Sequence, residues 1–233
     1  MKLKKVDKIV IACDGGASSG KTTGAKLISR KYNLEFLSSG LLYRYAAFLL
    51  LKNKPKKRIF FLRRIFKKLS INKLKKINLH TQEIDSTVSI IAKEKKIRLI
   101  LKKYQINFAK KNNKVCIEGR DISYAILPSA DIKFFFLCKD LNIAARRRWK
   151  ELRRKNKKIK FKEVKKSLKM RNFNDKNRRH NPLIKLPDSI VIRTDVLNKS
   201  QMIKKMSKII DFKVKQKYGI KNWVYKHKRY KRV

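Results

Sequence analysis

The chain has 233 residues and contains little cysteine, little negative charge and no long hydrophobic run. Its three cysteines, Cys13, Cys116 and Cys138, are widely spaced and include no C-x-x-C pair, so they indicate neither a disulfide framework nor a zinc site. The apolar run at residues 9–13 is too short for a signal peptide, and the run at 46–51 is too short to span a bilayer. We therefore expect a soluble cytoplasmic protein with reduced, buried thiols.

Acidic side chains are scarce, because 16 Asp and Glu stand against 66 Lys and Arg, for a formal net charge of +50. Such a chain attracts polyanions non-specifically and also attracts phosphorylated small molecules. Codon composition is a simpler explanation, because Lys, Ile and Asn have A/T-rich codons and are all abundant here. Hydrophobic residues make up 42% of the chain, which excludes a disordered protein and suits one compact domain with smaller appendages.

Short apolar runs alternate with longer amphipathic segments along the chain. The expected strands are residues 8–13, 35–37, 114–117, 132–138 and 189–193. The expected helices are residues 21–32, 41–51, 84–111, 141–155, 162–170 and 200–213. Strands separated by helices predict an α/β fold in which a five-stranded parallel sheet is covered by helices on both faces.

Two segments do not follow this pattern. Residues 52–78 are basic, contain Pro55 and lack a clean strand, so we interpret them as an insertion. Residues 212–233 are basic, include several aromatic side chains and show no strong core pattern. We predict that these last residues form a C-terminal tail outside the main domain.

A phosphate-binding motif follows the first expected strand. Residues 15–22 fit the P-loop pattern G-x-x-x-x-G-K-S/T between a strand and a helix, which predicts the three-layer P-loop NTPase fold. Its small residues allow backbone N–H groups to surround phosphate oxygens, while Lys21 would contact the β- and γ-phosphates and the Thr22 hydroxyl would ligate Mg²⁺. The predicted ATP-binding residues are Gly15, Gly16, Ala17, Ser18, Ser19, Gly20, Lys21, Thr22 and Thr23.

A second motif, in residues 39–44, distinguishes among P-loop proteins. It reads Ser-Gly-Leu-Leu-Tyr-Arg and resembles the S/T-G-x-x-Y-R segment of bacterial cytidylate kinases, which belong to the P-loop nucleoside-monophosphate kinases. We expect Ser39 to cap a helix and Tyr43, four residues later, to share its helical face. The resemblance implies that Ser39, Tyr43 and Arg44 hold the acceptor nucleotide, with the guanidinium on its phosphate.

Further matches follow in the order of the family. Ser89 and Arg98 stand nine residues apart on one long predicted helix, similar to the family's S-x8-R pair. The resemblance implies that Ser89 contacts cytosine and that Arg98 contacts the base or a phosphate. Gln105 matches a family glutamine, and an ordinary surface position on the helix explains it equally well.

An acidic residue ends the strand predicted at residues 114–117. Glu118-Gly119-Arg120-Asp121 resembles the family's D-G-R-D, and Glu118 has the Walker-B position, from which it would hold Mg²⁺ through a water. Glu118 stands where the family has aspartate, so its longer side chain is a departure. The resemblance implies that Arg120 and Asp121 face the acceptor, with Asp121 on ribose hydroxyls.

Two later segments resemble the family's lid. In residues 144–148, Arg147 and Arg148 match the last two arginines of R-A-x-R-R, whereas Ala144 replaces the first. A lid arginine would neutralise the charge that develops on the transferred phosphoryl group. Because this chain is rich in arginine, a surface position explains either residue taken singly just as well.

The second lid segment, residues 171–178, resembles R-D-x-x-D-x-x-R followed by P-L. Arg171 and Arg178 match, and two helical turns separate them, so one helix would present both on one face. Asn172 replaces an aspartate of the family pattern, and Asn174 stands where the family often has another arginine.

The sequence therefore predicts ATP-dependent phosphorylation of CMP and dCMP with Mg²⁺, by a monomer that has no membrane segment. The kinase domain is expected at residues 1–211, with an acceptor-binding insert at about 45–100 and a lid at about 141–180. Lys21, Arg147, Arg148 and Arg171 are the expected catalytic residues. No catalytic histidine is needed, so we place the three histidines, His80, His180 and His227, at the surface.

Two alternatives remain open at this stage. The same chemistry could act on another acceptor, such as UMP, AMP or shikimate. The chain could instead be an RNA-binding protein that uses the P-loop as a switch, because its net charge is +50 and Trp223, Tyr225 and Tyr230 lie among lysines near its end. Non-specific contact with nucleic acid through the basic surface or tail is compatible with either reading.

Overall fold

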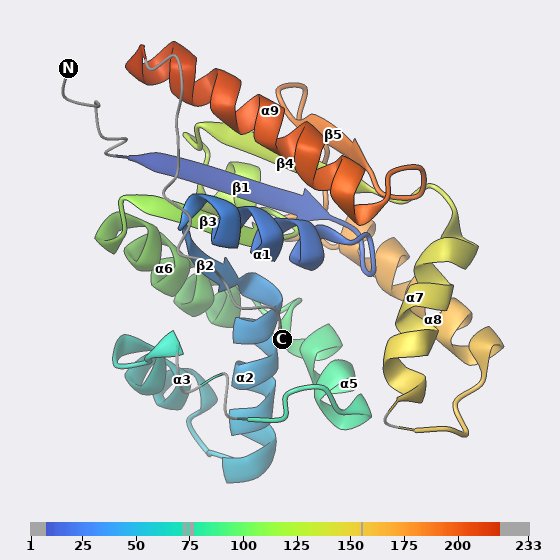
Figure 1. Ribbon diagram of the computed structural model, residues 1–233. Coiled ribbons are helices and arrows are strands. Elements are labelled where there is room, and N and C mark those ends of the chain that lie inside the picture. The colour runs from blue at the N-terminus through green and yellow to red at the C-terminus, as the bar shows by residue number, and fades with distance from the viewer. Residues whose placement is uncertain (1–7, 72–73, 75–76, 155, 220–233) are drawn as a thin grey trace.

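The computed structural model describes residues 8–71, 74, 77–154 and 156–219. Within these residues a single five-stranded parallel sheet has the strand order β2-β3-β1-β4-β5 (Figure 1). The strands are β1 (Ile9–Gly15), β2 (Glu35–Ser38), β3 (Lys114–Gly119), β4 (Ile132–Leu137) and β5 (Ile190–Arg193). The helices are α1 (Lys21–Tyr32), α2 (Ser39–Asn53), α3 (Arg58–Lys67), α5 (Gln82–Ile91), α6 (Lys95–Lys111), α7 (Leu141–Arg153), α8 (Phe161–Asn177) and α9 (Lys199–Tyr218).

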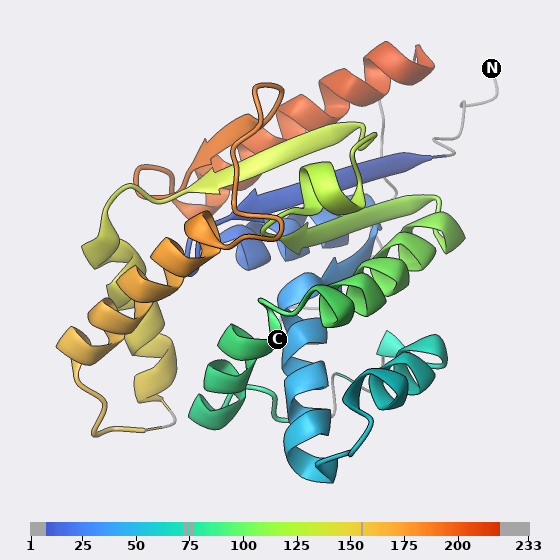
Figure 2. The same cartoon turned by 180° about the vertical axis from the view of Figure 1, so that it is seen from behind.

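Helices cover both faces of the sheet, and the alternation of side chains along each strand supplies the two cores. Ile11 and Cys13 of β1 face α1 and α9, whereas Ala12 between them faces the side of α2 and α6. Figure 2 shows the second face, with α6 and the π-helical turn η1 (Ile122–Ile126) in front of the strands. The predicted three-layer α/β architecture is confirmed.

All five strands lie where the sequence places them, but one predicted helix is wrong. The segment expected as a continuous helix over residues 84–111 is two helices, α5 and α6, with a turn at 92–94 between them. Ile91 and Ile97 are both completely buried in the same core cluster. In a continuous helix, residues six apart would point about 120° apart, so the turn lets both point into one core.

The last helix is longer than expected. α9 continues to Tyr218 and ends at Gly219, which has a left-handed φ of 64°. Val214 is buried in the core, and the Tyr218 hydroxyl donates to the carbonyl of Lys8 at the start of the chain. The boundary predicted at residue 212 therefore falls inside this helix, and the rest of the predicted tail lies outside the described residues.

Two helical units project from the edge where the strands end. In one unit, α2 packs against α5, and α3 lies against α6 in the part of the chain expected as an acceptor-binding insert. In the other, α7 packs against α8 (Figure 1). Ala17 of the loop after β1 joins Ala144, Ala145 and Leu168 in a small apolar cluster. This cluster anchors the α7–α8 unit beside the loop. No helix in the described part of the chain is both long and apolar enough to cross a membrane.

Candidate active site

The loop between β1 and α1 has the backbone of a phosphate cradle. Ser18 and Gly20 have left-handed φ values of 55° and 78°, which turn successive N–H groups toward one concave side. A Cβ at Gly15 would collide with the carbonyl oxygen of Phe136 on β4, so only glycine fits there. Thr194, just after β5, donates from its hydroxyl to the Ser19 carbonyl at 2.9 Å and steadies the far side of the loop.

The charged and hydroxyl groups of the loop meet at the end of β3. Lys21 is buried and donates from Nζ to the Gly16 carbonyl at 3.1 Å, with Glu118 Oε2 3.9 Å away. Burial lowers the Lys21 pKa to about 7, the Arg120 charge adding to this effect. The Glu118 carboxylate accepts hydrogen bonds from Thr22 Oγ1 at 3.0 Å and from Ser38 Oγ at 2.5 Å.

A hydroxyl and a carboxylate side by side at the phosphate cradle are hard oxygen donors that suit Mg²⁺. Glu118 stands where the family has aspartate, and its longer side chain lies within hydrogen-bonding distance of Thr22. No cluster of three or more His, Cys, Asp or Glu residues that could hold a metal occurs among the described residues. Few protein ligands are expected where nucleotide phosphates and waters complete the coordination.

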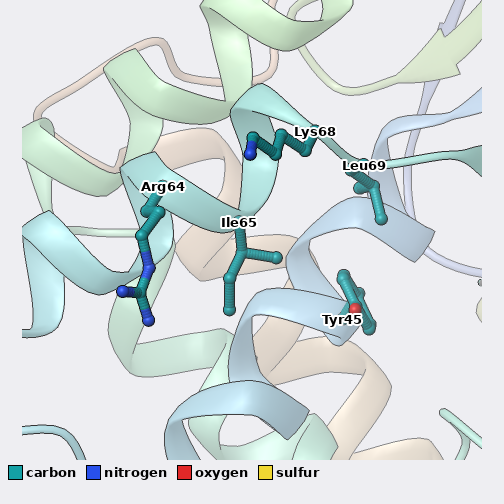
Figure 3. A pocket seen from close by; sticks show the side chains of 5 residues that line it. All are labelled: Tyr45, Arg64, Ile65, Lys68 and Leu69. Atoms are coloured by element: carbon teal, nitrogen blue, oxygen red, sulfur yellow. The ribbon is translucent and has the colours of Figure 1, made fainter.

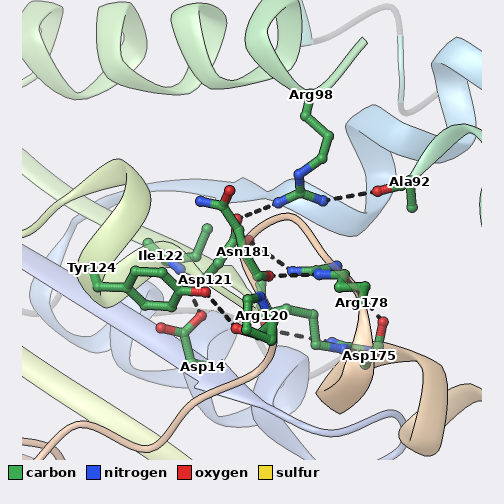
Figure 4. Close-up of polar contacts among 12 residues, drawn as sticks. Asp14, Ala92, Arg98, Arg120, Asp121, Ile122, Tyr124, Asp175, Arg178 and Asn181 are labelled. Atoms are coloured by element: carbon green, nitrogen blue, oxygen red, sulfur yellow. Dashed lines mark hydrogen bonds and ion pairs between the residues drawn. The ribbon is translucent and has the colours of Figure 1, made fainter. Parts of the chain in front are cut away.

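A second polar centre surrounds Asp121, three residues beyond Glu118 (Figure 4). The Asp121 carboxylate accepts from the Arg98 guanidinium and lies 3.6 Å from Arg178 Nη2. Tyr43 lies beneath Arg98, with the guanidinium carbon 5.8 Å from the ring centroid. Burial raises the Tyr43 pKa to about 12, so the phenol stays protonated at neutral pH.

These residues line a cavity of about 110 Å³. Its lining residues are Tyr43, Lys95, Arg98, Leu99, Lys102, Gln105, Asp121, Ile126, His180 and Asn181. Gln105 is 2% exposed, so it is a buried residue and not a surface one, and its amide oxygen has no hydrogen-bond partner among the described residues. The cavity therefore combines the Tyr43 ring, the Arg98 guanidinium, the Asp121 carboxylate and the amides of Gln105 and Asn181.

Asp14 fixes this centre, and sequence reasoning missed it. It is the second-last residue of β1 and directly precedes the P-loop. Its carboxylate accepts from the backbone N–H groups of Ile122 and Ser123, each at 2.8 Å, and from the Ser123 hydroxyl at 2.6 Å (Figure 4). Burial raises the pKa of the Asp14 carboxyl, although the three donors oppose the shift. One side chain thus joins the donor loop to the chain that carries Asp121. The sequence did contain a signal for Asp14, namely an acidic residue between an apolar run and the P-loop.

Arg120 and Arg178 are connected through the helix α8. Arg120 Nε donates to Asp175 Oδ2 at 2.6 Å, and Arg178 Nη1 lies 3.8 Å from the other oxygen of the same carboxylate. Burial alone would raise the Asp175 pKa, but the Arg120 charge and hydrogen bond, together with the charges of Arg171 and Arg178, outweigh it and lower the pKa. Arg178 lies one residue beyond the end of α8 in extended backbone, so the prediction that Arg171 and Arg178 share one helix is wrong.

Three of the predicted phosphate-binding arginines converge on one carboxylate, that of Asp85 on α5. Arg44 from α2 pairs with its Oδ1, Arg148 from α7 lies 3.0 Å from its Oδ2, and Arg171 from α8 lies 3.8 Å from Oδ1. Burial lowers the Arg171 pKa to about 10, with the Arg120 charge adding to the shift. Four elements that are far apart in the sequence therefore meet at this point.

Arg147 does not join this group. Its guanidinium donates to Thr194 at the carbonyl oxygen (2.5 Å) and at the hydroxyl (3.2 Å), so it ties α7 to the chain after β5. Asn172 on α8 accepts a hydrogen bond from the Ala17 N–H of the P-loop at 2.8 Å. The lid helices thus touch the loop directly through side chains to which the sequence had assigned other roles or none.

The two predicted serines lie outside the cavity lining. The helix cap of α2 is Ser38, whose hydroxyl accepts from the Leu41 N–H, so the prediction that Ser39 caps this helix is wrong. Ser39 is the first helical residue and is buried, next to Gly119, where a Cβ would lie 3.0 Å from the Ser39 Cβ. Ser89 is exposed on α5, and its hydroxyl donates to the backbone carbonyl of Asp85.

A further cavity of about 300 Å³ lies between α2 and α3 (Figure 3). It is lined by Tyr45, Arg64, Ile65, Lys68 and Leu69. None of these residues belongs to the P-loop, the Asp121 centre or the Asp85 group. This cavity is the larger of the two, but it is separate from the candidate active site.

The fold and the site together define a class of protein. A parallel sheet with a P-loop after its central strand, a Walker-B acid on the neighbouring strand and arginines over both is the arrangement of a P-loop phosphotransferase. The family model for cytidylate kinase matches residues 11–212. The chain belongs to the cytidylate kinase family, and it is an enzyme of the phosphotransferase type.

Individual relatives agree with this assignment. A cytidylate kinase of Mesomycoplasma hyopneumoniae (strain 7448) is 34% identical over 223 residues, which cover 90% of this chain and 96% of the relative. A cytidylate kinase of Fervidobacterium nodosum is 32% identical and covers 86% of this chain and 95% of its own. A crystal structure of an uncharacterized protein from Eubacterium ventriosum shares the fold, with a TM-score of 0.53 and 16% identity over 88% of this chain and 99% of that one.

Proposed function

We propose that this enzyme transfers the γ-phosphoryl group of ATP to the phosphate of CMP or dCMP, with CDP or dCDP and ADP as products. The observation that carries the proposal is the pairing of two anion sites at one edge of the sheet. The P-loop follows β1, and the Asp121 centre follows the adjacent strand β3, with Asp14 hydrogen-bonded between them. Two nucleotides bound there would meet through their phosphates.

On the donor side, residues 15–23 would bind the ATP phosphates through backbone N–H groups, with Lys21 as the buried cation. Thr22 and Glu118 would hold Mg²⁺, the carboxylate through a bound water, and the ion would neutralise charge on the phosphate oxygens. In the structure described here the Thr22 hydroxyl and the Glu118 carboxylate are already hydrogen-bonded at 3.0 Å. The Thr22 oxygen keeps lone pairs for the ion while its proton stays hydrogen-bonded to the Glu118 carboxylate.

On the acceptor side, the cavity around Asp121 would receive the nucleoside of CMP. Tyr43 offers an aromatic face, Arg98 and Arg178 offer donors, and the Asp121 carboxylate accepts from sugar hydroxyls or from an amino group. Ser39 and Ser89 were predicted to contact the nucleotide too. They would need to move toward the cavity when CMP binds.

The reaction itself needs no strong general base, because a phosphate monoester is already a nucleophile near neutral pH. Arg44, Arg120, Arg148 and Arg171 would position the two phosphates in line and stabilise the charge that spreads over the transferred group. Arg147 would act from the rim of the P-loop. The α7–α8 unit covers the site and would keep water from intercepting the phosphoryl group.

The test is release of ADP in a coupled assay with CMP, dCMP, UMP and AMP as acceptors. We expect CMP and dCMP to be phosphorylated with kcat/KM at least about 100-fold above UMP and AMP, as expected for a site that hydrogen-bonds its substrate. Lys21→Ala should abolish turnover, while Lys26→Ala, at an exposed position of the same helix α1, should leave it unchanged. Preferred turnover of UMP or AMP would contradict the assignment of the acceptor.

Three broader properties belong to the same proposal. We expect a cytoplasmic monomer with reduced thiols, and Cys13, Cys116 and Cys138 are free cysteines in the structure. The net charge of +50 supports weak, non-specific contact with nucleic acid. Such contact should disappear as salt is raised, without loss of kinase activity.

A further inference from the structure

Asp85 lies at the point where three arginines of the phosphate site converge, although the sequence assigned it no role. α5 holds its backbone firmly, because the Thr81 hydroxyl caps the helix at the Ile84 N–H, the Asp85 N–H donates to the Thr81 carbonyl, and Ile84 is buried. Its carboxylate remains 26% exposed and projects from the first turn of the helix. The backbone is fixed, while the side chain is partly open to solvent.

The geometry points to a specific role: we propose that the Asp85 carboxylate occupies the place of the acceptor phosphate in the substrate-free enzyme and leaves it when the phosphate arrives. This inference rests on the proposed function, because it concerns the arginines of the same site. Asp85 would hold Arg44, Arg148 and Arg171 together while the site is empty. The acceptor phosphate would then displace it.

The first argument is that Asp85 and a phosphate compete for the same donors. Arg44 already gives Nη1 to the Leu79 carbonyl at 3.0 Å, and Arg148 gives Nη1 to Glu151 at 2.9 Å. In both residues Nη2 is the nitrogen that faces Asp85. A phosphate that binds these arginines between the two nucleotides would use the same nitrogens.

The second argument is charge. Three guanidiniums from α2, α7 and α8 face a single carboxylate, so the group keeps a net positive charge even when Glu151 on Arg148 is included. A phosphate monoester carries close to two negative charges at neutral pH and offers three acceptor oxygens, so it neutralises the arginines better than Asp85 does. A carboxylate is therefore adequate to hold the arginines and weak enough to be replaced.

The third argument is that a protein oxygen also occupies an anion site on the donor side. Asn172, next to Arg171 on α8, places its amide oxygen 2.8 Å from the Ala17 N–H of the P-loop. That N–H belongs to the loop that would surround the ATP phosphates. Protein oxygens thus stand at both anion sites and hold the α7–α8 unit over them.

The experiment measures binding of inorganic phosphate and of CMP to enzyme whose P-loop is filled with a non-hydrolysable ATP analogue. Asp85→Asn removes the charge at nearly constant shape. We expect the Kd for both ligands to fall about fivefold, because the ion pairs that a phosphate must displace at a partly exposed site stabilise the empty state by up to about 1 kcal/mol. Asp85→Ser should shift both constants in the same direction. Thermal unfolding should show a lower Tm for the ligand-free variant and a larger rise on adding phosphate than in the wild type.

Glu151→Gln is the matched control. Glu151 also pairs with Arg148, from the exposed surface of α7, and among the described residues no ion pair joins it to Arg44 or Arg171. The Glu151→Gln variant also removes one negative charge, and we expect its Kd for phosphate to change by less than about twofold. An equal effect in both variants would reduce the role of Asp85 to net charge.

Weaker binding of phosphate and CMP in Asp85→Asn would overturn the proposal and make Asp85 a residue that positions the arginines for substrate. These binding measurements involve no turnover. If the enzyme phosphorylated neither CMP nor dCMP, the proposed function would fail while the comparison of the variants would still decide the role of Asp85.

Discussion

Lys21 makes a prediction that depends on pH. Its ammonium is buried with no phosphate beside it, and burial lowers its pKa from the ordinary 10.5 to about 7. ATP would surround the same nitrogen with negative charge and restore a high pKa. Binding of ATP above neutral pH should therefore take up a proton from solvent.

The size of the effect follows from this pKa. At pH 8 a group with a pKa of about 7 is about nine-tenths neutral, so roughly 0.9 proton should be taken up for each ATP analogue bound. Above pH 7 the Kd should weaken by about tenfold for each pH unit. The stability of the ligand-free enzyme should move the opposite way and rise between pH 7 and about 10.5, because there the unfolded chain binds the proton and the folded chain does not.

Calorimetric titration of a non-hydrolysable ATP analogue at pH 8, in two buffers with different ionisation enthalpies, measures the protons directly. The γ-phosphate of the analogue is already deprotonated there and contributes little, since phosphoryl groups have a second pKa near 6. Lys21→Met cannot titrate and should show no uptake, with weaker binding. Identical binding enthalpies for the wild type in both buffers would refute the assignment of a neutral Lys21 to the free enzyme.

Three other predictions follow from single contacts. Asn172→Ala should bind the ATP analogue several-fold more tightly, because the Ala17 N–H loses its internal acceptor, and Asn174→Ala on the same helix is the control; equal effects would exclude the contact. Asp121→Asn should raise the KM for CMP at least tenfold, because it removes the carboxylate that pairs with Arg98 and Arg178 at the proposed acceptor site, while the KM for ATP stays within about twofold in steady-state kinetics. Phe136→Ala should lower the free energy of unfolding by about 3–5 kcal/mol in urea titrations, because this side chain is completely buried between α1 and α9, and a loss below about 1 kcal/mol would contradict that packing.

The donor half of the site was readable from the chain because its parts are neighbours in sequence. The cradle, Lys21 and Thr22 lie within one strand–loop–helix unit, so a pattern of eight residues predicts their positions. The strands were equally accessible, since each is a short run of apolar side chains bounded by polar ones. The ends of the elements were harder to predict. α9 runs past residue 213 because Val214 packs in the core and the Tyr218 hydroxyl donates to the Lys8 carbonyl.

The lid arginines show what the pattern could not decide. Arg147 and Arg148 are adjacent and match the family equally well, yet consecutive helix residues point about 100° apart. Arg147 reaches Thr194, while Arg148 reaches Asp85. Which of the two faces the phosphates depends on how α7 lies against α8, and neighbouring residues carry no information about that.

Local chemistry along the chain was therefore enough to establish a phosphate-binding loop, its cation and the order of the layers, because these depend on backbone geometry and apolar periodicity over a few residues. Tertiary packing alone brought Asp14 to the chain beside Asp121, Asn172 to the P-loop and Asp85 to three arginines. Each of these contacts joins residues separated by many positions in sequence. The role of a carboxylate or an amide depends on the donors that the folded chain places around it.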